Sequence, residues 1–87
     1  MDGEFFSDLL AAVRQQIDSP QTPYVGETFQ RLVAAGLSKD DALEQIAVCL
    51  GDEMENIALE RRAFDEAAYR AALNALPMEE NPGTEIE

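Results

Sequence analysis

Carboxylates are the only abundant side chains in this chain that could take part in chemistry. The densest group is Asp52, Glu53 and Glu55, with Glu60 farther along. Paired carboxylates can act as general acid and base, as they do in glycosidases. The spacing of the apolar residues around them directs Asp52 and Glu55 to solvent and places Glu53 at the edge of the apolar stripe. Exposed carboxylates keep ordinary pKa values and are poor acids at neutral pH. We therefore interpret the group as a solvated helix face, with weak divalent-cation binding and catalysis as the alternatives.

Other catalytic side chains are scarce. The chain has no histidine, which is the most common general base and a usual zinc ligand. Its one cysteine, Cys49, lies within a helical turn of acidic residues, and negative neighbours raise the pKa of a thiol. We interpret Cys49 as a small hydrophobic residue on a helix flank. No Glu-x-x-His pair, calcium-binding loop or glycine-rich phosphate loop is present. We expect a protein without enzymatic activity, with no catalytic residue, metal site or cofactor.

The charge of the chain limits its partners. Eighteen acidic residues face six basic ones, which gives a net charge of −12. Such a chain repels nucleic-acid phosphates and anionic membrane surfaces, so we expect no direct binding to either. The sequence also shows no signal peptide and no apolar run long enough to cross a membrane. These features favour a cytoplasmic protein.

The apolar residues recur at helical spacing in four segments separated by breaks. The pattern predicts helices over about residues 4–17, 22–36, 38–61 and 65–77. We expect an all-α, four-helix domain over residues 1–77, made of two helical hairpins with a long central third helix. A flexible acidic tail is predicted for residues 78–87.

Residues at the helix starts carry recognisable capping signals. Thr22 precedes Pro23, which indicates a capping hydroxyl followed by proline at the first helical position. Ser38 and Asp65 are expected to cap the third and fourth helices through their side chains. These signals make three of the four helix starts predictable.

The second and third helices are expected to end in different ways. Gly36 predicts a left-handed residue that ends the second helix. Arg61 and Arg62 indicate a fraying end of the third helix, where cations suit the helix dipole. Phe64 and Tyr69 occupy the two positions of a hydrophobic staple at the start of the fourth helix.

The third helix carries the strongest pattern. Its predicted buried stripe consists of Leu43, Ile46, Ala47, Leu50, Met54 and Ile57. Gly51 lies in mid-helix beside small residues, which indicates a close crossing with another helix, either the first or fourth of this chain or one from a partner. Val48 and Leu59 lie opposite the stripe among acidic residues.

One segment resembles a known family. Residues 27–43 read ETFQRLVAAGLSKDDAL, which is similar to a family of small bacterial helical proteins of unknown function. The family's closing helix resembles the run RAFD at 62–65 followed by Tyr69 and Leu73. The likeness extends over about residues 22–76. Family members often carry a histidine where this chain has Glu44. The resemblance therefore implies a helical, bacterial, cytoplasmic protein, and it implies no metal or acid–base role.

Two functions are compatible with this sequence. The first is a small interaction module that docks on another protein, or on a second copy of itself, through the outer face of the third helix. The residues expected to make that contact are Val48, Asp52, Glu55 and Leu59. The alternative is an acidic decoy or inhibitor that occupies the basic, nucleic-acid-binding surface of a partner, in which case salt should weaken binding.

Overall fold

The structure, a computed structural model, describes residues 2–77 and contains four α-helices in that range. They are α1 (Asp2–Asp18), α2 (Pro23–Ala34), α3 (Lys39–Glu60) and α4 (Glu66–Asn74). This confirms the predicted all-α fold and its long third helix. The predicted tail at 78–87 lies outside the described residues. No helix within residues 2–77 is long and apolar enough to cross a bilayer.

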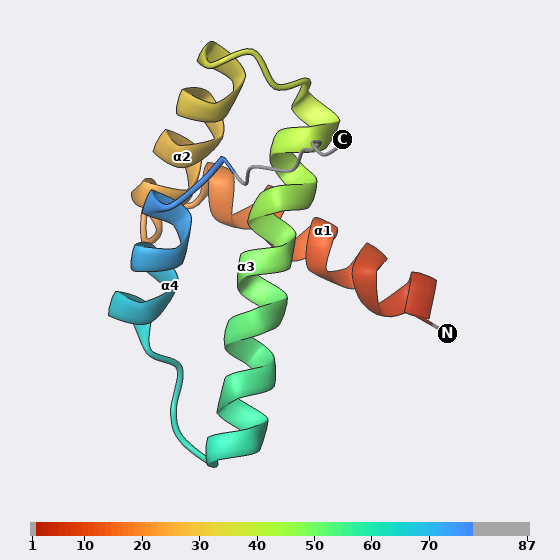
Figure 1. Cartoon of the computed structure of the whole chain (residues 1–87), viewed down its shortest axis with the longest axis vertical. Coiled ribbons are helices and arrows are strands. Elements are labelled where there is room, and N and C mark those ends of the chain that lie inside the picture. Colours follow the sequence, from red (N-terminus) through yellow and green to blue (C-terminus); the bar gives the residue numbers. More distant parts are fainter. Residues whose placement is uncertain (1, 78–87) are drawn as a thin grey trace, which may run out of the picture.

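Helix α3 is the centre of the arrangement and contacts the other three helices. Helices α2 and α4 lie on one side of α3 and contact each other (Figure 1). Helix α1 crosses α3 at a steep angle, so its C-terminal part lies beside α2 while its N-terminal part extends past α3 (Figure 1).

The core lies where α3 meets the other helices. Its apolar residues come from all four helices and from the segment after α4, because each helix contributes the stripe that its 3.6-residue period gathers on one face. The buried apolar residues are Leu9, Val13, Val25, Leu32, Ala42, Ile46, Ala47, Cys49, Leu50, Tyr69, Leu73 and Leu76.

The predicted helix starts at Pro23, Ser38 and Asp65 are confirmed. Pro23 occupies the first position of α2. The Ser38 hydroxyl accepts a hydrogen bond from the Asp41 N–H at 3.0 Å. The Asp65 carboxylate accepts one from the Ala68 N–H at 3.1 Å. These bonds form within one turn, so local sequence is enough to specify them.

The turn after α2 and the staple before α4 are also confirmed. Gly36 has a φ of 113°, which a residue with a Cβ rarely adopts. The rings of Phe64 and Tyr69 pack edge to face with centroids 5.6 Å apart. The staple fixes the direction in which the chain enters α4.

Two predictions about single side chains are wrong. The Thr22 hydroxyl does not cap α2; it donates to the Gln16 carbonyl at 2.8 Å and ties the α1–α2 turn together. Met54 is not a core residue, since its side chain is 45% exposed. Position 54 lies inside the predicted stripe, between Leu43 and Ala47 on the helical wheel, so its exposure shows that no neighbouring helix fully covers the stripe there.

The end of α3 has a defined left-handed cap, where the sequence indicated a fraying end. Arg61 adopts a left-handed conformation with a φ of 54° and a ψ of 47°. The Arg62 N–H then donates to the Ile57 carbonyl at 3.2 Å. These features match a standard helix stop in which a residue other than glycine takes the left-handed position.

Two glycines mark where helices approach closely. A Cβ on Gly51 would lie 3.1 Å from Leu9 Cδ1, so this glycine admits α1 of the same chain. A Cβ on Gly26 would lie 3.0 Å from the Ile17 carbonyl oxygen, which brings α2 against the backbone of α1. Of the two interpretations offered for Gly51, the intramolecular crossing therefore accounts for it.

Polar bonds join helices that are distant in sequence. The Tyr69 hydroxyl donates to Gln16 Oε1 at 2.8 Å and connects α4 to α1. The Arg31 guanidinium donates to the Leu73 and Leu76 carbonyls, at 2.9 and 2.7 Å. The Leu73 carbonyl also accepts from the Leu76 N–H at 3.1 Å, so Arg31 adds a further donor there and joins α2 to the end of α4.

Candidate protein-interaction groove

A groove opens where α1 and α3 diverge from their crossing, and its volume is about 770 Å³. One wall is the N-terminal half of α1 and the other is the second half of α3. The residues that line it are mostly apolar: Phe5, Phe6, Leu9, Val48, Gly51, Met54 and Ala58, together with Asp52 and Glu55.

Large apolar side chains in this groove remain open to solvent. Phe5 is 55% exposed, Met54 45% and Val48 39%. Single exposed apolar residues are ordinary, but here three of them share one concave site. Contiguous apolar surface of this kind is typical of protein interaction sites.

The charged residues of the groove are all acidic. Asp52 and Glu55 are three residues apart on α3 and therefore lie on the same side of the helix. Among the described residues that line the groove, none is Lys or Arg. Across residues 2–77, no group of three or more acidic, cysteine or histidine side chains could hold a metal ion. The groove therefore combines an apolar floor, formed by Phe5, Phe6, Leu9 and Met54, with two negative side chains, Asp52 and Glu55.

The structure brings together three of the four residues that the sequence predicted for partner contact. Val48, Asp52 and Glu55 all line the groove. Leu59 is 72% exposed and lies outside it.

Sequence reasoning missed the contribution of Phe5 and placed Met54 in the core, whereas Phe6 lines the groove and also packs against the core. The signal available for Phe5 was that it is next to a second phenylalanine. Neighbouring positions on a helix point about 100° apart, so both rings cannot face the same core.

Cys49 is buried at 7% exposure, which agrees with its interpretation as a small hydrophobic residue. Burial, together with the nearby Asp52 carboxylate, raises the pKa of its thiol. A thiol held in its neutral form is a weak nucleophile. Cys49 therefore belongs to the packing of α3.

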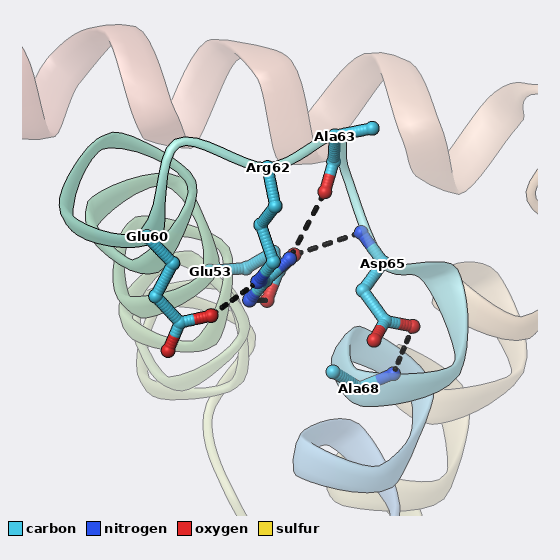
Figure 2. A network of polar contacts seen from close by, with 6 residues as sticks. All are labelled: Glu53, Glu60, Arg62, Ala63, Asp65 and Ala68. Carbon is cyan, nitrogen blue, oxygen red and sulfur yellow. Dashed lines mark hydrogen bonds and ion pairs between the residues drawn. The ribbon is translucent and has the colours of Figure 1, made fainter.

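Glu53 is the one buried carboxylate among the described residues, with an exposure of 3%. Its Oε2 accepts from Arg62 Nη1 at 2.7 Å and from the Asp65 N–H at 2.8 Å, and its Oε1 accepts from Arg62 Nη2 at 3.1 Å (Figure 2). The hydrogen bonds from Arg62, followed by the one from Asp65, hold the pKa of Glu53 below its usual value.

The Glu53–Arg62 pair closes the turn between α3 and α4. Arg62 also donates to Glu60 at 2.6 Å and to the Ala63 carbonyl at 3.0 Å (Figure 2). Because Asp65 caps α4, the same network positions the start of that helix. Glu53 therefore stays ionised and connects α3 to the start of α4. The sequence analysis placed Glu53 at the edge of the apolar stripe and did not predict this structural role.

A second hollow, of about 240 Å³, lies between α2 and α4. Its two cations are already engaged by the protein. Arg31 binds the carbonyl groups at the end of α4, and the Arg70 guanidinium carbon lies 4.9 Å from the centre of the Tyr24 ring. The residues of this hollow therefore join helices, and the α1–α3 groove is the stronger candidate for binding.

Comparison of the chain with protein-family models finds no match, and no curated protein or solved structure matches it either. The resemblance to small bacterial helical proteins over about residues 22–76 therefore stays a prediction. The candidate site rests on the geometry of the groove.

Proposed function

We propose that this chain is a non-catalytic interaction module that binds another protein in the α1–α3 groove. The observation that carries this proposal is the concave apolar site in which Phe5, Val48 and Met54 remain exposed. Covering these side chains would remove apolar surface from water, at about 25 cal/mol per Å². In the chain alone these side chains stay exposed to water, so a partner that covers them gains this free energy.

The chemistry of the groove supports a binding role over catalysis. Among the described residues that line it, Asp52 and Glu55 are the titratable ones, and both are exposed. The buried carboxylate, Glu53, is held by Arg62 outside the groove lining. Both groove carboxylates are open to solvent, which favours contact with a partner over proton transfer, so enzymatic activity is not proposed.

The acidic decoy remains a second candidate because of the net charge of −12. A decoy would bind through its carboxylates, and the apolar groove would stay empty. The two functions therefore differ in which surface is covered and in how steeply salt weakens binding.

Site-specific photocrosslinking tests the proposal. A photoreactive phenylalanine analogue is placed at Phe5 or at Met54, and the variant is expressed in the host cell and irradiated. We expect both positions to yield an adduct with the same protein. A matched control places the analogue at Ala71, which is exposed on α4 outside the groove, and should yield none.

The outcomes separate the candidates. Adducts at both groove positions and none at Ala71 support the groove as a protein-binding site. An adduct whose partner is the chain itself identifies a homodimer. The absence of adducts at both groove positions, or equal adducts at Ala71, contradicts the proposal.

A further inference from the structure

The shape and the charge of the groove favour one kind of bound segment. We propose that its occupant is a basic amphipathic helix of another protein, a statement that rests on the function proposed above. The apolar face of that helix would contact Phe5, Phe6 and Met54, and its Lys and Arg residues would pair with Asp52 and Glu55.

The length of the groove suits a short helix. Its α3 wall runs from Val48 to Ala58, which at 1.5 Å per residue is about 15 Å. A helix of about three turns covers that distance. Such a helix presents apolar residues at i, i+3, i+4 and i+7 along one side, the pattern by which helices are recognised in grooves.

A helix suits these walls better than an extended peptide does. Both walls are α-helices whose backbone N–H and C=O groups bond within their own helix. An extended peptide would find no backbone partners there, and its own N–H and C=O groups would lose water without compensation. A helix enters with its backbone hydrogen bonds already made.

Charge selects a basic partner. Asp52 and Glu55 lie at the groove with no cation among the described lining residues. The chain as a whole carries −12, so a positive segment is attracted before contact and a negative one is repelled. Electrostatic complementarity of this kind contributes to partner choice and to the association rate.

The same argument disfavours a second copy as the occupant. None of the four helices carries more basic than acidic residues, and α3 has one Lys against seven Asp and Glu. A second copy would bring an excess of negative charge to Asp52 and Glu55. A separate protein with a basic helix meets no such repulsion.

Titration with a synthetic probe tests the inference. The probe is a fluorescently labelled peptide of about four helical turns, with Leu at i, i+3, i+4 and i+7 and with Lys and Arg on the flanking positions. Binding is measured by fluorescence anisotropy, and the site is mapped by amide chemical shifts of the isotope-labelled chain. We expect saturable binding with shifts confined to residues of the groove. Affinity should fall when ionic strength rises from about 0.01 to about 0.15 M.

Three variants distinguish the groove from general charge attraction. Met54→Glu adds a negative charge but spoils the apolar floor, so it should weaken binding at least about tenfold if the peptide occupies the groove. Asp52→Asn/Glu55→Gln should weaken binding by about three- to tenfold at low ionic strength and reduce its salt dependence. Glu27→Gln/Glu44→Gln removes the same charge from exposed positions outside the groove and should match wild type. Circular dichroism confirms that each variant is folded.

The results decide the inference separately from the proposed function. Loss of affinity in Met54→Glu together with wild-type behaviour of the Glu27 and Glu44 variant supports it. The inference is overturned if Met54→Glu binds the peptide as tightly as wild type or more tightly. It is also overturned if the two charge-removed variants lose the same amount of affinity. In that case crosslinking at Phe5 and Met54 still decides whether the groove binds a protein of other chemistry.

Discussion

The Arg62 guanidinium reaches back along the chain to Glu53, with Nη1 2.7 Å from Oε2, and closes the turn that joins α3 to α4. The carboxylate is 3% exposed and also accepts from the Asp65 N–H. A buried carboxylate of this kind is tolerated because each of its oxygens has a donor. The pair therefore decides where α4 begins relative to α3.

Glu53→Gln should destabilise the fold because the amide has only one accepting oxygen: if it takes the place of Oε2, the amide NH2 faces the Arg62 Nη2 donor, and the charge that pairs with the guanidinium is lost. We expect a clear fall in Tm, measured by circular dichroism. Glu60→Gln is the matched control, since Glu60 binds the same guanidinium but is 60% exposed, and it should change Tm little. Equal effects of the two substitutions would show that burial of Glu53 adds nothing.

The same contact predicts a dependence of stability on pH. Because the pKa of Glu53 is lowered in the folded state, its contribution to stability is present above the usual glutamate pKa of about 4.3 and is lost as pH falls through the folded pKa. Acid also relieves the repulsion among eighteen carboxylates, so wild type alone would mix two effects. The Tm difference between wild type and Glu53→Gln should therefore be constant near pH 7 and shrink below about pH 4. A difference that grows on acidification would contradict this assignment.

Gly26→Ala and Gly51→Ala should differ although both glycines lie within helices. Alanine favours a helix by about 1 kcal/mol relative to glycine. At position 26 the new Cβ would lie 3.0 Å from a backbone carbonyl, which cannot move without shifting α1. We expect a net loss there of about 1–3 kcal/mol in the free energy of unfolding, measured in urea. At position 51 the neighbour is the end of the Leu9 side chain, which can rotate, so the loss should be smaller or absent.

Arg61→Gly should stabilise the protein. A left-handed conformation costs a residue with a Cβ roughly 1–2 kcal/mol, and glycine avoids that strain while adding entropy to the unfolded chain. The net gain should be about 0.5–1 kcal/mol in urea unfolding. Arg61→Ala removes the same charge but keeps the Cβ, so it should give no gain. A matching gain in both variants would assign the effect to charge.

The order of the helices and the starts of α2, α3 and α4 could be predicted because they depend on residues close in sequence, whereas α4 ends at Asn74, three residues before the predicted end. The bonds at Ser38 and Asp65, the left-handed Gly36 and the Phe64–Tyr69 staple each involve positions within about one or two helical turns. Such interactions repeat with the helix period, so their spacing is readable from the chain. The same spacing placed Val48, Asp52 and Glu55 on one side of α3, where all three line the groove; their contact with a partner stays a prediction.

Only the tertiary structure decided how the helices cross, and that crossing determined the rest. The angle of α1 across α3 uncovered Met54, placed Phe5 and Phe6 on a groove, and left Leu59 outside it. The return of the chain after α3 buried Glu53 under Arg62, although its position on the helical wheel was at the margin of the stripe. Apolar periodicity specifies which face of a helix is buried, but it does not specify which helix covers that face or how far the cover extends.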